Sequence, residues 1–351
     1  MKYSIIVPVF NRPDEVDELL ESLTRQTLKD FEVVIVEDGS KIPCKDVCDK
    51  YANILDLHYY AKPNSGPGQS RNYGAERANG EYVIILDSDV VLPQGYLQAV
   101  DNSLTSEIVA FGGPDASHLS FTPVQKAISY SMTSFFTTGG IRGSSPQSGR
   151  ARGALDKFYP RSFNMGIRRD VYLQLGGFTK MRFGEDIDFS YRIVEAGYRP
   201  RLFPEAWVWH KRRTDFRKFF RQVYNSGIAR INLEKRHPGT MKLVHLLPTV
   251  FTVGVIALIL ISAVGRALMH YVDRDQFYWM CFAPWIPILL YSLLICVDST
   301  AKNQSLRVGI LSVPAAFVQL MGYGLGFIES WWKRCILKQD EFQAFEKTFY
   351  K

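Results

Sequence analysis

The chain has 351 residues and a formal net charge of +7, a length that accommodates two structural units at about 150 residues per domain. The charge suits nucleic acid, anionic lipid or phosphorylated ligands, but no nucleic-acid motif accompanies it, so we expect no nucleic-acid partner. The five cysteines form neither a disulfide framework nor a CxxC pair with nearby histidines. We therefore expect reduced thiols and no structural zinc.

The first 90 residues alternate apolar runs with helical patterns. Strands are predicted at 3–10, 31–36, 57–60 and 82–86. Helices are predicted at 11–26 and 68–78. The opening run, MKYSIIVPVF, has no cleavage site of small residues and is interpreted as a strand, not a signal peptide. This alternation predicts an α/β domain with a mostly parallel sheet, whose ligands bind at the carboxyl ends of the strands.

Polar clusters follow these strands. Asp87 and Asp89 follow the fourth strand with one residue between them. Carboxylates at this spacing can share a divalent cation, which would neutralise a diphosphate. Glu37 and Asp38 follow the second strand, where a carboxylate can accept hydrogen bonds from a base or from ribose hydroxyls. Each cluster taken alone is also compatible with an ordinary turn.

A third cluster begins at Asn64 and leads through two glycines to Arg71. Backbone amides and a guanidinium at a helix start favour phosphate or ribose oxygens. Further along, residues 137–153 are rich in glycine and arginine. This stretch is either a solvated linker or a mobile loop over the cleft, in which Arg142, Arg150 and Arg152 grip phosphate.

Three long apolar runs dominate the C-terminal third: Leu243–Val264, Phe277–Val297 and Val308–Ile328. Each approaches the roughly 20 residues that cross a bilayer as a helix; buried core helices are the alternative. Tryptophans near the run ends fit an interfacial belt: Trp279, Trp285, Trp331 and Trp332. The predicted organisation is a catalytic domain at 1–210, a basic amphipathic juxtamembrane segment at 211–242, membrane helices at 243–330 and a basic tail at 331–351.

Two topology rules conflict if all three runs cross the membrane. Basic residues lie both before the first run and in the tail, and positive flanks prefer the cytoplasmic side. An even number of crossings satisfies both ends. We therefore predict two full crossings and one re-entrant or interfacial segment. The third run is the candidate for that segment, because Pro314, Gly322, Gly324 and Gly326 would let it bend.

Five segments in order resemble glycosyltransferase family 2, enzymes of the GT-A type that use nucleotide sugars. They are SIIVPVFNRPDEV, VVIVEDGS, NSGPGQSRNYGAERANGEYVIILDSDV, FNMGIRRDVYLQLGGF and FGEDIDFSYR. The resemblance covers roughly residues 1–210. It implies a Rossmann-like GT-A domain followed by transmembrane or interfacial helices.

The resemblance also implies residue roles. It places the nucleotide at Pro8, Glu37, Asp38, Asn64, Arg71 and Asp87. It places the metal at Asp87, Asp89 and His210, with Asp89 as the direct ligand of the DxD motif. It implies that Asp186 is the general base, with Glu185 and Asp188 as competitors. Glu37 stands where the family often has Asp. Residues 221–225 lack the Q-x-x-R-W motif of processive synthases.

These features together predict an inverting, non-processive transfer from a UDP- or GDP-sugar, with Mn²⁺ or Mg²⁺, to a lipid-linked acceptor. The expected setting is envelope or capsule polysaccharide or glycolipid assembly at a bacterial inner membrane, with the catalytic domain facing the cytoplasm. A polyprenyl-phosphate sugar synthase is the alternative within this class. A transporter or channel with a nucleotide-binding regulatory domain is the alternative outside it, disfavoured because the apolar runs contain no Asp, Glu, Lys or Arg.

Overall fold

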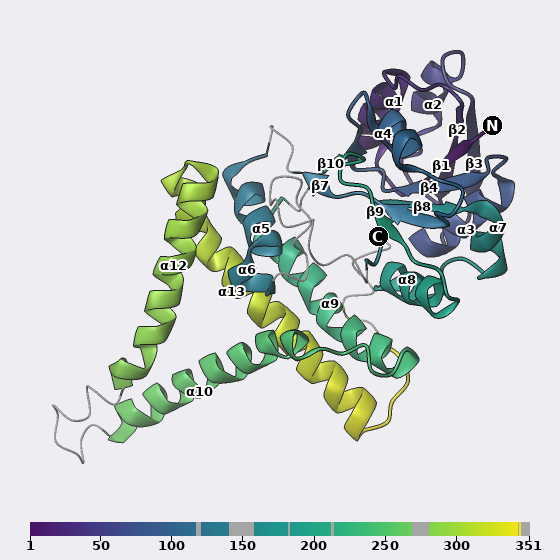
Figure 1. Cartoon of the computed structure of the whole chain (residues 1–351). Coiled ribbons are helices and arrows are strands. Elements are labelled where there is room, and N and C mark those ends of the chain that lie inside the picture. Colours follow the sequence, from purple (N-terminus) through teal and green to yellow (C-terminus); the bar gives the residue numbers. More distant parts are fainter. Residues whose placement is uncertain are drawn as a thin grey trace. The chain divides into compact units, whose positions relative to one another are not determined.

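The structure, a computed structural model, describes residues 1–116, 121–139, 158–181, 183–211, 214–268, 281–342 and 344. The chain divides into two compact units, one of residues 1–119 and 143–211 and the other of 120–142 and 212–351 (Figure 1). Residues 120–142 thus group with the C-terminal helices, although they precede the predicted boundary at 210. Most of the predicted glycine-rich loop, Trp279 and the end of the tail lie outside the described residues.

The first unit is built on a seven-stranded sheet of order β3-β2-β1-β4-β8-β6-β9. β3, β2, β1 and β4 are parallel, β8 is antiparallel to both β4 and β6, and β9 is parallel to β6. The strands are β1 Tyr3–Val9, β2 Phe31–Asp38, β3 Leu57–Lys62, β4 Tyr82–Leu86, β6 Ala110–Gly112, β8 Asn164–Arg168 and β9 Arg201–Leu202. The predicted α/β domain with a mostly parallel sheet is confirmed.

Helices cover both faces of this sheet. Successive residues of a strand point to opposite faces, and in this sheet the residues on both faces are apolar. Ile5 and Val7 of β1 belong to the core under α1, α2 and α4, whereas Ile6 belongs to the core under α3, α7 and α8 (Figure 1). The helices are α1 Pro13–Thr24, α2 Lys45–Tyr51, α3 Pro67–Arg77, α4 Tyr96–Ser103, α7 Arg169–Gln174 and α8 Glu185–Glu195. Burial on both faces explains why the strands are continuous apolar runs.

A second, smaller sheet has the order β5-β10-β7. Its strands are β5 Val90–Val91, β7 Asp115–Ala116 and β10 Val208–His210. In its register His210 lies opposite Val90, the residue after Asp89. On the other side of β10, Val208 lies opposite Asp115. This small sheet therefore determines where the histidine meets the acidic residues.

The second unit is helical. Its α-helices are α5 Pro123–Thr133, α6 Phe135–Thr138, α9 Phe216–Arg236, α10 Leu247–Leu268, α12 Ile286–Asn303 and α13 Leu306–Trp331. Short 3₁₀ helices η3 Leu243–His245 and η4 Ala283–Trp285 precede α10 and α12, and the π-helix η5 Trp332–Ile336 follows α13. α13 packs against α5, α9, α10 and α12. Among the described residues, three helical segments are long and apolar enough to cross a membrane: Leu243–Ala267, Ala283–Asn303 and Leu306–Ile336. The three predicted apolar helices are thus confirmed by length and composition.

The third of these helices does not reverse direction. α13 is continuous through Pro314, so the predicted re-entrant bend is absent. Its glycines instead permit close packing. A Cβ on Gly326 would lie 2.0 Å from the carbonyl oxygen of Tyr224 in α9, and one on Gly324 would lie 2.2 Å from Thr252 Oγ1 in α10. Small residues let helix backbones approach closely. At these positions the close packing outweighs the low helix propensity of glycine.

Candidate functional site

The predicted nucleotide residues lie at neighbouring carboxyl ends of parallel strands. Val9 at the end of β1 lies opposite Glu37 at the end of β2, and Pro8 lies opposite Val36. β4 runs beside β1 on its other side and leads directly into Asp87. The parallel register therefore brings together the carboxyl ends of β1, β2 and β4, and with them polar residues that are far apart in the sequence.

Asp87, Asp89 and His210 form a group whose potential ligand atoms all lie within 4.8 Å of one another. His210 Nε2 lies 3.3 Å from Asp89 Oδ1, and its Nδ1 lies 3.7 Å from Asp115 Oδ2. The imidazole ring stacks on Phe163, with 5.0 Å between ring centroids. Two carboxylates and an oriented imidazole are a donor set that fits a divalent cation such as Mn²⁺. The sequence offered no sign of Asp115 or Phe163, because distant strand pairing brings both to the histidine.

Arg12 neutralises the second carboxylate of this group. Its Nη1 donates a hydrogen bond of 2.7 Å to Asp89 Oδ2. Burial by itself would raise the pKa of Asp89, but the positive charges of His210 and Arg12 hold that pKa well below its ordinary value. Arg12 was not among the residues predicted from the sequence, although its place shortly after the first strand was a usable signal.

Arg71 joins the two acidic parts of the site. Its Nη2 donates to Asp87 Oδ1 at 2.7 Å, and its Nη1 donates to Glu185 Oε1 at 3.0 Å. The guanidinium also lies over the ring of Phe178 at 5.1 Å, and only 4% of the side chain is exposed. Arg71 is predicted to contact the nucleotide, but in this structure carboxylates of the chain itself bind both of its terminal nitrogens.

Three acidic residues begin α8, the region of the predicted general base. Asp186 is the most exposed of them, with 17% of its side chain accessible against 9% for Glu185 and 3% for Asp188. Asp186 Oδ2 lies 3.3 Å from Nη1 of Arg161, a partner that the sequence did not reveal. Burial raises the pKa of Glu185 to about 7, against the opposing charge of Arg71.

The carboxylates that end β2 shape the neighbouring turns. Asp38 accepts hydrogen bonds from the amides of Ser65 at 2.8 Å and Gly66 at 2.9 Å, and it pairs with Lys62. Asn64 Nδ2 donates to the carbonyl oxygen of Asp38 at 2.8 Å. These contacts hold the turn between β3 and α3 against the end of β2.

Glu37 has a different set of partners, although it is adjacent in sequence. It accepts hydrogen bonds from the amide of Cys44 at 2.7 Å and from the hydroxyl of Tyr59 at 3.3 Å. The Ser40 hydroxyl also donates to it. Glu37 is buried, so its contacts hold together the segment between β2 and α2. Of the two neighbours, Asp38 has the contacts that reach the glycine-rich turn.

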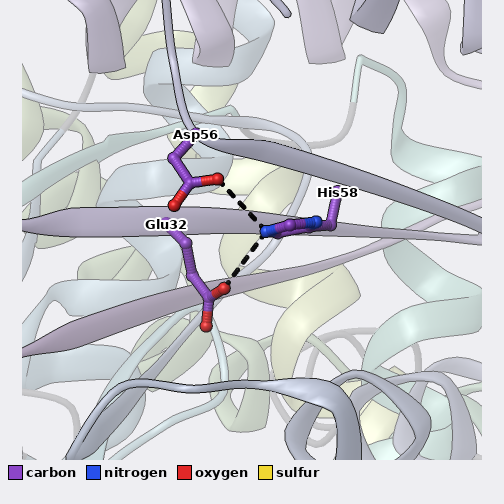
Figure 2. A group of neighbouring side chains, drawn as sticks. All are labelled: Glu32, Asp56 and His58. Atoms are coloured by element: carbon purple, nitrogen blue, oxygen red, sulfur yellow. Dashed lines mark ion pairs between the residues drawn. The ribbon is translucent and has the colours of Figure 1, made fainter. Parts of the chain in front are cut away.

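A second group of metal-ligand type lies at the opposite ends of the strands (Figure 2). His58 Nε2 lies 3.3 Å from Glu32 Oε2 and 3.2 Å from Asp56 Oδ1. Glu32 is fully buried and accepts hydrogen bonds from Ser4 Oγ and from the backbone and side chain of Asn79. Because these donors already satisfy Glu32, we interpret the group as a clamp between β2 and the turn before β4.

The sequence matches Glycosyl transferase family 2 over residues 4–173. It is similar to the pre-mycofactocin glycosyltransferase of Mycobacterium tuberculosis, at 28% identity over 273 residues that cover 76% of this chain and 53% of that protein. It is also similar to the poly(ribitol-phosphate) beta-N-acetylglucosaminyltransferase TarS of Staphylococcus aureus, at 42% identity over 93 residues that cover 25% of this chain and 16% of TarS. The chain thus spans about half the length of the first relative and less of the second.

A solved structure shares the fold. The mannosyltransferase from Pyrobaculum calidifontis in complex with GDP-Man and Mn²⁺ matches at a TM-score of 0.56 and 15% sequence identity, over 95% of this chain and 88% of that one. The family match, the related sequences and this GT-A fold agree with the five resembling segments. Residues 4–173 of the chain thus form a glycosyl transferase family 2 domain.

Proposed function

We propose that the chain transfers a single sugar from a nucleotide-diphosphate donor to a lipid-linked acceptor, with inversion at the anomeric carbon. The observation that carries this proposal is the meeting of Asp87, Asp89 and His210 beside the carboxyl ends of β1, β2 and β4. The family and the shared fold support a nucleotide-sugar donor. The missing Q-x-x-R-W motif supports transfer of one sugar at a time.

The donor proposal is a UDP- or GDP-sugar held with Mn²⁺ or Mg²⁺. Asp87, Asp89 and His210 would hold the cation, and the Pyrobaculum protein with GDP-Man and Mn²⁺ supports this assignment. When bound, a divalent cation neutralises the diphosphate and stabilises it as a leaving group. The nucleoside would lie at the carboxyl ends of the strands and contact Pro8, Glu37, Asp38 and Asn64. Arg71 would complete this site through its bond to Asp87.

The proposed general base is Asp186. It would accept the proton of the acceptor hydroxyl while that oxygen attacks the anomeric carbon opposite the departing nucleoside diphosphate. Asp186 is more accessible than its neighbours, and Nη1 of Arg161 lies 3.3 Å from its Oδ2. Glu185 is buried and bonded to Arg71, and Asp188 accepts hydrogen bonds from Thr179 and Arg192. Both neighbours thus support the start of α8.

The apolar helices support a membrane setting for the acceptor. Leu260 of α10 and Leu289 of α12 are 60% and 66% exposed, and other large apolar side chains on both helices are exposed as well. Surfaces of this size and polarity are stable against lipid rather than water. We propose a lipid-linked acceptor in envelope polysaccharide or glycolipid assembly at a bacterial inner membrane, with the first unit on the cytoplasmic side.

The test is metal-dependent release of nucleoside diphosphate from UDP- and GDP-sugars, with lipid extract as acceptor. Asp89→Ala should lower the release by about 100-fold or more, because it removes a direct ligand of the cation. Asp49→Ala is the matched control, since Asp49 is an exposed residue of α2 that pairs with Lys45. Full activity of Asp89→Ala, or of the wild type in chelator, would refute the metal site. A product with the sugar on the lipid phosphate would identify a polyprenyl-phosphate sugar synthase.

A further inference from the structure

Arg12 is a cation beside a carboxylate that is also a proposed metal ligand. We propose that Asp89 holds Arg12 as a placeholder cation in the metal-free chain and releases it to the donor diphosphate when a divalent cation binds. Arg12 would then be a donor-binding residue as well as a competitor of the metal. The inference rests on the proposed metal-dependent transfer and adds a residue to it.

The first argument is the geometry of Asp89. One of its oxygens lies 2.7 Å from Arg12 Nη1, and the other lies 3.3 Å from His210 Nε2. Both oxygens of the proposed ligand are therefore occupied by donors of the chain. Within the part of the chain that the structure describes, Asp89 is the one side chain bonded to the guanidinium of Arg12. Loss of this pair leaves the guanidinium free to bind another anion.

The second argument is the difference between the two arginines of the site. Arg71 is buried, bonded to two carboxylates and stacked on Phe178, so it is fixed in place. Among the described side chains the guanidinium of Arg12 is bonded to Asp89, and 32% of the Arg12 side chain is exposed. A long side chain with one bond and access to solvent can change partners without disturbing the core.

The third argument is that the backbone beneath Arg12 is anchored. Asn11 adopts a left-handed conformation, with φ of 55°. Its Oδ1 accepts hydrogen bonds from the amides of Lys41 at 2.7 Å and Ile42 at 3.0 Å. The carbonyl oxygen of Arg12 accepts the bond from the amide of Val16 that begins α1. The Cα of Arg12 therefore stays at the end of β1, and only the side chain needs to move.

Electrostatics gives the direction of the exchange. Two cations that share one carboxylate repel each other, and a divalent ion adds two charges where Arg12 supplies one. A nucleoside diphosphate brings new negative charge to the same edge of the sheet. Guanidinium groups bind phosphate oxygens through two parallel hydrogen bonds. Metal binding and donor binding together therefore favour transfer of Arg12 from Asp89 to the diphosphate.

The test compares Arg12→Gln with the wild type in two binding measurements. In the first, electron paramagnetic resonance of free Mn²⁺ reports binding of the metal alone to nucleotide-free protein. We expect Arg12→Gln to bind Mn²⁺ about two- to fivefold more tightly, because a partly exposed competing ion pair has been removed. In the second, with Mn²⁺ saturating, we expect UDP and GDP to bind about tenfold more weakly, because a charge-assisted hydrogen bond is lost.

The opposite signs separate this role from a structural one. A variant that merely distorts the site would weaken both Mn²⁺ and nucleotide binding, and that result would overturn the inference. Unchanged Mn²⁺ affinity, or tighter Mn²⁺ binding with unchanged nucleotide affinity, would overturn it as well. A wild type that binds no Mn²⁺ would instead refute the proposed metal site itself, so the two failures are distinguishable.

Three further variants complete the experiment. Arg25→Gln removes an arginine from the other end of α1, where it pairs with exposed Glu21, and should change neither affinity. Arg12→Lys keeps the charge and should keep the Mn²⁺ affinity near that of the wild type, while nucleotide binding falls because the fork of donors is lost. His58→Asn, carried in every sample, removes the second metal-type group of the described residues from the Mn²⁺ signal.

Discussion

Acidic and basic side chains alternate across the site. Arg12 contacts Asp89, while Arg71 contacts both Asp87 and Glu185. Each of these carboxylates thereby has a basic partner, and Arg71 links the metal group to the start of α8. The effects of substitutions at these residues should therefore not be additive, because each charged side chain contacts the next.

Replacement of the proposed base isolates the chemical step. Asp186→Asn keeps the shape and loses the proton acceptor, so turnover should fall by about 100-fold or more, with donor affinity nearly unchanged. Turnover and donor binding are measured separately, and Asp170→Asn serves as control because Asp170 is an exposed partner of Arg168. A collapse of donor affinity would make Asp186 a binding residue and move the base to Glu185 or Asp188.

The buried Glu185 predicts a pH dependence of stability. Its pKa is raised from an ordinary 4.5 to about 7, so between these values the folded chain binds more protons than the unfolded chain. The free energy of unfolding should therefore fall as the pH rises through this window. Glutamine cannot titrate and can still accept the hydrogen bond from Arg71. Over the same pH range the free energy of unfolding of Glu185→Gln should therefore fall less than that of the wild type.

The measurement for Glu185 is thermal unfolding in chelator at pH 5, 6, 7 and 8. Glu21→Gln is the control, since Glu21 is exposed and pairs with Arg25. The same decrease in the wild type and in Glu185→Gln would show that Glu185 does not titrate in this range.

Packing between helices α9 and α13 depends on glycine. A Cβ on Gly227 of α9 would lie 2.2 Å from the carbonyl oxygen of Tyr323 in α13, and backbone cannot move aside cheaply. Gly227→Ala should therefore destabilise the second unit by about 1–3 kcal/mol, as overpacking does. Thermal unfolding in detergent measures the change.

The matched control is Gly254→Ala in α10, where nothing lies within 4 Å of the added Cβ. That variant should be neutral or stabilise by up to about 1 kcal/mol, because alanine favours helix. Equal effects at Gly227 and Gly254 would mean that α9 and α13 do not pack this closely. The basic segment before the first apolar run includes α9, and this close contact gives it a structural role as the packing partner of α13.

The three apolar helices differ in how much the chain covers them. α10 and α12 leave most of their apolar side chains exposed, whereas one face of α13 is buried against the other helices of its unit. Because protein covers only a small part of α10 and α12, the rest of their apolar surface requires lipid, and α13 does so to a lesser degree. We therefore keep the prediction of two full crossings, with α13 as an interfacial helix.

Cysteine labelling in intact cells tests this topology. In a chain whose five native cysteines are replaced, a cysteine beside Lys347 should resist a membrane-impermeant reagent, because two crossings return the tail to the cytoplasmic side. A cysteine at Asp275, between the first two runs, should react and serves as the positive control. Labelling at both positions would indicate three crossings.

Local patterns were sufficient for much of this protein. The buried strands, the polar residues that end them and the three apolar helices follow from periodicity, turn chemistry and run length, which are properties of neighbouring residues. The acidic pair at Asp87 and Asp89 was predictable for that reason. The family resemblance supplied His210 and Asp186, which no local pattern would have selected.

Other features depend on contacts between distant segments. Pairing of β10 with β5 and β7 places His210 between Asp89 and Asp115, and Arg12 and Arg161 acquire their partners in the same way. The glycines of α13 were interpreted from the sequence as points of bending, but the packed helices use them for close approach. The sequence by itself determined which segments form strands and helices and where polar groups end them, because hydrogen bonding and hydrophobic periodicity act locally. Only the tertiary structure decided which charges meet, because burial and strand register join residues that share no local pattern.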